Sequence, residues 1–497
     1  MIEKGKQPGA HALSGAVVNP RSLRQLFGDR KRIADMPFFG EVRSESVYML
    51  TRHNAVRIPA PPTMHNHGNY VASLSRLCRW LAEEAETAGA MILPETSATK
   101  LLVGDGRVRG IRTGDRGRGR RGEELGNFEP GSDIVARVTV LCEGTQGHLT
   151  GVAIDRFALA GENPEVWALG VKEVWRVPRP LDRVIHTMGW PLRSAARYRE
   201  FGGSFIYPLG EDMVALGMVV GLDYRDAELS VHDLLQELKT HPLVAGLLEG
   251  GERIEWGAKT IPEGGFVALP KRLHAPGVLL CGDGAGFVNV PALKGIHYAV
   301  ESGRLAAEAA FSALGRGTTP WAPGALAAYD EAVQDSFIWK DLEEVRNMRQ
   351  AFGRGFWMGG ALAGVMTATK GHLPPGEAHT ERDADQELVI TARSREYPVP
   401  DGKLTFDKLS SVFASGNKTR DDQPNHVRVQ MRVASELARA WERMCPAQVY
   451  EAQITAGAGL VSVQVTPSNC VQCGAITAKG GRLTPPEGGS GPEYSLA

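Results

Sequence analysis

Four short segments between residues 165 and 220 predict a separate β-sheet. They are 165–174, 184–188, 203–209 and 213–220, and turn sequences at 189–191 and 210–212 interrupt them. Short apolar or alternating runs bounded by glycine, proline and polar residues are typical of strands. We therefore expect a strand-rich domain over residues 156–255.

On either side of this domain, the pattern changes to helices that alternate with strands. Apolar residues recur at helical spacing over 70–81, and Gly89 stands where a helix C-cap is expected. The following sequence predicts a strand at 90–93, a hairpin formed by 100–103 and 108–113, and a buried strand at 135–141. A helix is expected from about His297 to Leu314. Such alternation is typical of an α/β domain.

The segment 276–286 carries the strongest chemical signal in the chain. A short buried strand ends near Asp283, Gly284 continues a glycine-rich loop, and Gly295 precedes the predicted helix. An acid in that position can accept hydrogen bonds from ribityl hydroxyls, and the helix N-terminus can stabilise negative charge on a reduced isoalloxazine. This order favours a flavin site, although a plain strand–turn–helix with a capping aspartate would look similar.

Two weaker signals accompany this segment. The strand at 135–141 runs into Glu143 and Gly144, a small-residue turn of the kind that brings backbone close to a cofactor. Gly202 and Gly203 lie among phenylalanines, where they either admit a flat ligand or form a β-bulge. No Gly-x-Gly-x-x-Gly follows a strand at the start of the chain, so the first βαβ element of a dinucleotide-binding fold is expected to be absent.

Length and charge narrow the possible functions. A chain of 497 residues is too long for one hydrophobic core, so several domains are expected. The formal net charge of −1 gives no reason to expect a general polyanion binder. The glycine- and arginine-rich run 115–124 has no interleaved aromatic residues, so we interpret it as a solvated loop and expect no nucleic-acid partner.

An apolar segment at 355–369 indicates contact with a lipid surface or a buried helix. A helix of about 15 residues would be about 22 Å long, too short for a hydrocarbon core of about 30 Å. Arg354 and Lys370 flank the segment, and Phe356 with Trp357 favours an interfacial position. Residues 371–400 are polar and proline-rich, as in a linker.

Three of the six cysteines gather near the C-terminus. Cys470 and Cys473 form a Cys-x-x-Cys motif, and Cys445 precedes a predicted strand pair at 449–456 and 460–466. This pattern is typical of a metal or iron–sulfur site. A [4Fe-4S] cubane requires four thiolates, whereas the next position at this spacing is Ile476. Three thiolates leave open a [3Fe-4S] cluster, a labile [4Fe-4S] cluster, a zinc site or no metal at all.

Taken together, these segments resemble the electron-transfer flavoprotein:ubiquinone oxidoreductase family over nearly the whole chain. The matching stretches include 9–15, 66–70, 189–192, 202–205, 215–224, 263–266, 422–424, 445–451 and 485–489. The resemblance implies a mixed α/β and α+β chain. A Rossmann-like FAD domain (1–155 and 256–335) would be interrupted by a mixed-sheet ubiquinone domain (156–255). A helical membrane-proximal segment and linker (336–400) and a ferredoxin-like cluster domain (401–497) would follow.

The resemblance also implies residue roles and partners. Glu3, Glu143, Gly144 and Asp283 fall on the family's FAD positions, Gly202 and Gly203 on its quinone pocket, and Cys445, Cys470 and Cys473 on its cluster ligands. Electrons would pass from reduced electron-transfer flavoprotein through an iron–sulfur cluster and FAD to ubiquinone. The protein would attach as a monotopic enzyme to a bacterial inner membrane or the mitochondrial inner membrane. A cluster-less flavoprotein reductase or hydroxylase and an inactive remnant are the alternatives.

Overall fold

The computed structural model describes residues 1–315, 319–390, 395–453 and 459–497. Its largest layer is a seven-stranded sheet in the order β16-β12-β15-β14-β13-β3-β4. Only the β13–β3 pair is parallel within this sheet. The strands are β3 (Glu45–Leu50), β4 (Ala55–Ile58), β12 (Trp167–Arg176), β13 (Val184–Gly189), β14 (Gly202–Pro208), β15 (Met213–Gly221) and β16 (Glu252–Pro262).

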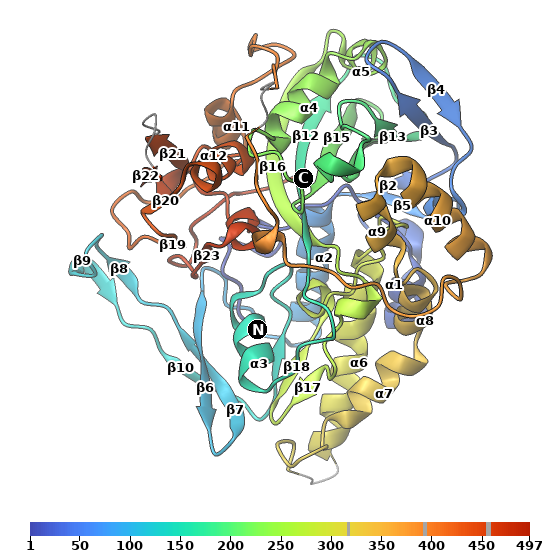
Figure 1. The fold of residues 1–497 in the computed structure, drawn as a ribbon. Coiled ribbons are helices and arrows are strands. Elements are labelled where there is room, and N and C mark those ends of the chain that lie inside the picture. The colour runs from blue at the N-terminus through green and yellow to red at the C-terminus, as the bar shows by residue number, and fades with distance from the viewer. Residues whose placement is uncertain (316–318, 391–394, 454–458) are drawn as a thin grey trace.

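The four strands predicted between 165 and 220 are confirmed as β12 to β15. The sheet is larger than predicted, because β3 and β4 come from the N-terminal part and β16 continues to Pro262. Helices α4 (Val231–Lys239) and α5 (Pro242–Leu248) follow β15, and α4 packs on β12 and β15 (Figure 1). Burial on both faces explains why these strands are almost continuously apolar.

The α/β part is built around a small sheet in which β11 (Thr139–Leu141) pairs in parallel with β18 (Val278–Leu280). Strand β17 (His274–Ala275) completes this sheet, and α6 (Ile296–Gly315) confirms the helix expected at 297–314. Around it lie α3 (His148–Arg156), α7 (Ala327–Asp335) and α8 (Phe337–Glu344). The carboxyl ends of β11 and β18 therefore lie side by side, where α/β proteins bind ligands.

A β-arm extends from this part of the molecule beside the C-terminal module (Figure 1). It comprises β6 (Ala98–Gly104), β7 (Arg107–Thr113), β8 (Arg116–Arg118), β9 (Glu124–Glu129) and β10 (Asp133–Val135). The β6–β7 hairpin is as predicted, with positive φ angles at Asp105 and Gly106. The continuous strand predicted at 135–141 is wrong, because β10 pairs with the arm and β11 with the core.

The N-terminal part supplies a second small sheet of β1 (Val17–Val18), β2 (Phe38–Glu41) and β5 (Tyr70–Ala72), with α1 (Arg21–Phe27) beside α6. Helix α2 (Leu74–Thr87) begins at Ser73, whose side chain accepts a hydrogen bond from the Arg76 N–H. The strand predicted at 90–93 is reduced to one parallel bridge between Ile2 and Leu93. Met91 is 74% exposed, so the short apolar run there is not a buried strand.

The C-terminal module is a small α+β unit. It contains α11 (Lys408–Ala414), α12 (Ser435–Met444), β19 (Val427–Arg428), β20 (Arg432–Ala434), β21 (Tyr450–Gln453), β22 (Leu460–Val465) and β23 (Arg482–Leu483). Strands β21 and β22 confirm the predicted pair, although 454–456 lie outside the described residues. Buried residues of this module, including Trp441 and Ile476, belong to the same hydrophobic cluster as the large sheet. The module is thus packed against the sheet.

Between these parts lie α9 (Met348–Ala351) and α10 (Phe356–Ala368). Helix α10 corresponds to the apolar segment predicted at 355–369, and several of its side chains are exposed, with Trp357 at 70% and Met358 at 58%. Across the described ranges, no helix combines the length and apolarity needed to cross a membrane.

Candidate functional site

One large cavity lies where the α/β part, the large sheet, α10 and the C-terminal module meet. Its volume is about 1980 Å³, larger than the 300–1,000 Å³ usual for a single small-molecule site. Residues from all four parts line it, among them Glu3, Asp283, Gly203, Phe356 and Gln472. The cavity therefore has room for more than one ligand.

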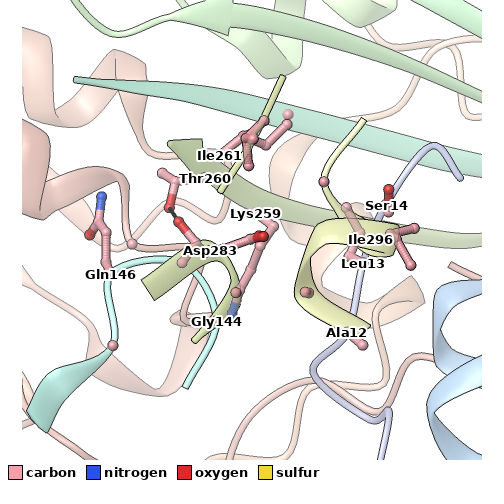
Figure 2. Close-up of a pocket in the computed structure, with 18 of the residues that line it drawn as sticks. Ala12, Leu13, Ser14, Gly144, Gln146, Lys259, Thr260, Ile261, Asp283 and Ile296 are labelled. Carbon is pink, nitrogen blue, oxygen red and sulfur yellow. Dashed lines mark hydrogen bonds between the residues drawn. The ribbon is translucent and has the colours of Figure 1, made fainter. Parts of the chain in front are cut away.

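Asp283 stands at the carboxyl end of β18, in a 3₁₀ turn over Gly282–Ala285. Burial raises the pKa of its carboxyl to about 6, although the positive charge of Lys259 acts in the opposite direction. The carboxyl lines the cavity wall, as Figure 2 shows with Lys259, Thr260 and Gly144 nearby. A carboxyl in that position can accept hydrogen bonds from ligand hydroxyls that replace the water it lost on burial.

Gly295 precedes α6, whose first N–H groups lack partners within the helix. It lines the cavity, and a Cβ placed on it would lie 3.5 Å from the Asp283 Oδ1 atom. Gly284 does not line the cavity; a Cβ there would contact Thr150 of α3 at 3.4 Å. The assignment of Gly284 to the cofactor site therefore stays a prediction from the sequence.

Glu143 follows β11 and caps α3 rather than projecting a free carboxylate. Its Oε2 accepts hydrogen bonds from the N–H groups of Leu149 and Thr150 and from the Thr150 hydroxyl, at 2.7–2.9 Å. The chain turns at Gly144, whose φ is +72° and beside which a Cβ would meet no atom within 4 Å. Backbone here can approach a ligand closely, while the Glu143 side chain holds α3 in place.

Glu3 and Lys4 form another side of the cavity. The Glu3 N–H donates to the Leu93 carbonyl at 2.9 Å, and its Oε1 accepts from the Gly5 N–H at 2.6 Å. The Lys4 Nζ donates to the Gln472 side-chain oxygen at 2.9 Å. Sequence reasoning missed Lys4, although it directly follows the acid that the family resemblance singled out.

Gly202 and Gly203 lie in the middle of the large sheet, on β14 between β13 and β15. A Cβ on Gly202 would fall 2.0 Å from the Val219 carbonyl oxygen, and one on Gly203 would fall 2.6 Å from that of Thr187. Their pairing with β15 is regular, so the alternative of a β-bulge is wrong. Both glycines line the cavity.

Helix α10 places one stripe of residues against the same cavity and another against the outside. Phe356, Gly360, Ala363 and Thr367 line the cavity, at spacings that fall on one helix face. Met366 is only 3% exposed, so it does not belong to the outer apolar surface of α10.

Cys445, Cys470 and Cys473 come together in the C-terminal module. They line a small cavity of about 20 Å³, with Ile476 in its wall. The Val449 N–H points at the Cys445 sulfur and the Gln472 N–H at the Cys470 sulfur, each at 3.4 Å. Burial raises the pKa of all three thiols, that of Cys473 to about 12. Soft thiolate donors of this kind suit an iron–sulfur cluster, which would also hold them deprotonated.

The side chains around the cysteine pocket limit which metal centre the module can hold. Within the described ranges, no three cysteine, histidine or carboxylate side chains converge on a point that could hold one metal ion. Ile476 is buried at 4% exposure and offers no ligand atom, so the donor set fits a cluster with three thiolates but not a fourth.

A junction between the two sites was not predicted. The Thr260 N–H and hydroxyl both donate to the Cys473 carbonyl, at 2.8 and 2.9 Å. The Lys259 Nζ donates to the Gln472 carbonyl at 3.2 Å. Lys259 and Thr260 belong to β16 and also line the large cavity (Figure 2). No local signal singled out Lys259, because β16 also carries the charged residues Glu252, Arg253 and Glu255.

Two stretches of the chain match family models. Residues 167–261 match the model described as "ETF-QO, ubiquinone-binding", and residues 402–495 match "Electron transfer flavoprotein-ubiquinone oxidoreductase, 4Fe-4S". A mitochondrial electron transfer flavoprotein-ubiquinone oxidoreductase of Dictyostelium discoideum is 39% identical over 523 residues, covering 99% of this chain and 85% of the relative. The chain belongs to the electron transfer flavoprotein-ubiquinone oxidoreductase family. It is therefore an oxidoreductase, and the resemblance inferred from its motifs is confirmed.

Other relatives agree with this assignment. The family member of Arabidopsis thaliana is 38% identical (100% of this chain, 79% of the relative), and that of Pseudomonas aeruginosa is 37% identical (99% and 92%). Among solved structures, a geranylgeranyl bacteriochlorophyll reductase-like protein of Thermoplasma acidophilum aligns with a TM-score of 0.56 at 17% identity, covering 76% of this chain and 85% of that one. A variant of a flavin-dependent brominase aligns with a TM-score of 0.50, also at 17% identity (74% and 87%). These two likenesses concern the fold alone.

Proposed function

We propose that this chain accepts electrons from reduced electron-transfer flavoprotein, passes them between an iron–sulfur cluster and FAD, and delivers them to ubiquinone. The supporting observation is the continuous route from the cysteine pocket, through Thr260 and Lys259, to the large cavity and its wall at Gly203. Family membership supports FAD and an iron–sulfur cluster as the cofactors.

FAD, when bound, exchanges one or two electrons, and the cluster exchanges one at a time. The residues that would hold FAD are Asp283, the backbone at Gly144 and Gly295, and Glu3. Asp283 would accept hydrogen bonds from the ribityl chain, and the N–H groups at the start of α6 would face negative charge on the isoalloxazine. Glu143 would act indirectly, by holding α3 and the turn at Gly144.

Ubiquinone would bind beside Gly202 and Gly203. Both glycines line the cavity, so the backbone of β14 forms part of its wall, where a flat ring can approach it. Phe201, Phe352 and Phe356 line the same region, and apolar aromatic walls suit a prenylated ring. This end of the cavity adjoins α10, so a lipid-soluble substrate would enter there.

The exposed side of α10 would rest on a membrane surface. Trp357, Met358 and Val365 are 70%, 58% and 47% exposed, and an apolar face of this kind can lie in the lipid interface without crossing it. We place the protein peripherally on a respiratory membrane, either the bacterial inner membrane or the mitochondrial inner membrane.

Reconstitution with the donor and the acceptor tests the proposed function. Anaerobically purified protein should contain FAD, iron and acid-labile sulfide. Its flavin absorbance should bleach on addition of reduced electron-transfer flavoprotein and return on addition of a short-chain ubiquinone. Protein that contains both cofactors but is not reduced by the flavoprotein would contradict the proposed donor. Failure of only the second step would contradict ubiquinone as acceptor.

Ile476 favours a second candidate function, that of a cluster-less flavoprotein reductase or hydroxylase of the same superfamily. With a buried isoleucine in the fourth position, the pocket supplies three thiolates only. Protein with about one FAD per chain but neither iron nor sulfide would support this candidate over the first.

A further inference from the structure

Two half-buried lysines lie between the large cavity and the cysteine loop. Lys4 donates to the side chain of Gln472 and Lys259 to its backbone carbonyl, at 2.9 and 3.2 Å. Gln472 stands between Cys470 and Cys473 with a positive φ of 54°. The two lysines thus hold the loop that carries two of the three thiols in a conformation that residues other than glycine rarely adopt.

The charges around the lysines show that they face both sites. Burial lowers the pKa of Lys259 to about 8, and the charge of Lys4 acts in the same direction, whereas Cys473, Glu3 and Cys470 raise it. On the other side, the charge of Lys259 opposes the rise in the pKa of Asp283. The pKa of Lys4 is likewise lowered by burial and raised by Glu3, Glu143 and Cys470. Lys259 therefore interacts with the flavin side and the cysteine side at once.

A positive charge in this place has a direct electrostatic consequence. Each redox centre becomes more negative when it accepts an electron, and a nearby cation stabilises the reduced form. Buried charges are screened by salt much less than surface charges. At an effective dielectric constant of about 20 and a separation of about 10 Å, the interaction of two unit charges changes an equilibrium constant by roughly tenfold or more.

We propose that Lys259, with Lys4, is a positioning residue that raises the electron affinity of the cluster and the flavin and fixes the cysteine loop against the flavin side. Its charge acts on both centres, so the difference between their potentials changes less than either potential alone. Thr260 completes the contact, because its two hydrogen bonds hold the Cys473 carbonyl against β16. This inference rests on the proposed function.

Reductive titration of charge variants tests the proposal. Lys259→Gln removes the charge and keeps a hydrogen-bond donor, whereas Lys259→Arg keeps both. We expect Lys259→Gln to lower the equilibrium constant for one-electron reduction of the cluster about tenfold, which is 59 mV for one electron. The flavin should shift in the same direction. Lys259→Arg should stay within twofold of the wild type. The readouts are paramagnetic resonance of the cluster and flavin absorbance at set potentials.

Lys172 provides a control, because it is a buried lysine that lines the same cavity. Its Nζ donates to the Ser14 carbonyl at 2.9 Å, and its pKa is lowered to about 8 by burial, with Glu255 as the opposing charge and no cysteine involved. Lys172→Gln should leave the cluster potential within twofold. An equal cluster shift in Lys172→Gln and Lys259→Gln would overturn the proposal, as would an unchanged potential in Lys259→Gln.

Two further outcomes keep this inference separate from the proposed function. Should Lys259→Gln fail to fold, Lys4→Gln gives the second measurement, and an unchanged cluster potential there overturns the role of the lysine pair. Wild-type protein that holds FAD but no iron would contradict the cluster step of the proposed function. In that case the reduction potential of the flavin tests the inference. A lower potential in Lys259→Gln than in Lys259→Arg supports it, and equal potentials in the two variants overturn it.

Discussion

Replacement of Asp283 by asparagine should stabilise the apoprotein while weakening FAD binding. Burial raises the pKa of the Asp283 carboxyl from an ordinary value of 3.8 to about 6. A raised carboxyl pKa means that the folded state binds the proton more tightly than the unfolded state does. The cost of ionisation is therefore absent below about pH 4, grows between about pH 4 and 6, and is complete above that range.

The shift of about two pKa units corresponds to about 3 kcal/mol at 1.36 kcal/mol per unit. The carboxyl faces the cavity rather than protein on all sides, so water there screens part of the cost. We therefore expect ionisation of Asp283 to cost the folded apoprotein about 1–3 kcal/mol of stability. Asparagine fills the same space without a charge. The free energy of unfolding of Asp283→Asn should therefore exceed that of the wild type by this amount at pH 8 and by almost nothing at pH 4.

The assay is thermal unfolding of FAD-free wild type and Asp283→Asn protein at pH 4 and pH 8. Comparing the gain at the two pH values cancels any effect of the amide that does not depend on pH. With saturating FAD, the wild type should melt at a higher temperature than Asp283→Asn, because bound FAD stabilises the wild type more than the variant. An equal difference between the two proteins at both pH values would refute the reasoning.

Glu143→Gln is the matched contrast, because it is the second acid of the predicted flavin signature. Its carboxylate accepts hydrogen bonds from Leu149 and Thr150 at the start of α3. Hydrogen bonds to a charged group contribute about 1.5–3 kcal/mol, against about 0.5–1.5 kcal/mol for neutral ones. Neutralising Glu143 should therefore destabilise the protein by about 1–2 kcal/mol at pH 8, the opposite sign to Asp283→Asn.

Three further predictions concern the quinone wall, the apolar face and the cluster. Gly202→Ala, whose Cβ would fall 2.0 Å from a carbonyl oxygen of β15, should lower ubiquinone turnover at least tenfold with FAD content unchanged. Gly210→Ala, at a left-handed glycine where the nearest atom is 3.7 Å away, should retain turnover; equal losses would argue against the assigned pocket. Combined Trp357→Ser and Met358→Ser should abolish liposome co-sedimentation without lowering the melting temperature, because both side chains are exposed; undiminished binding would place the membrane contact elsewhere. Ile476→Cys should convert a [3Fe-4S] resonance in the oxidised protein into a [4Fe-4S] signal seen only after reduction. A variant that stays iron-free, like its parent, would exclude the cluster.

Local sequence patterns were sufficient for many of the elements. The apolar runs and turns between 165 and 220 predicted β12 to β15, and helical spacing predicted α6, because burial of strand and helix faces sets which positions along the chain are apolar. Asp283 and Gly295 were recognisable because a strand, a glycine turn and a helix follow one another within one short segment. The three cysteines were likewise evident from spacing and from the family resemblance.

Tertiary structure decided how distant segments combine. No local pattern shows that β3 and β4 join a sheet more than 100 residues away in sequence, since strand pairing depends on partners that the period does not identify. Glu143 could be recognised as an acid after a strand, but only the fold shows that its carboxylate caps α3. Lys259 became significant only when β16 placed it between Asp283 and the cysteine loop. A buried charge takes its role from the groups around it, and folding brings those groups from far along the chain.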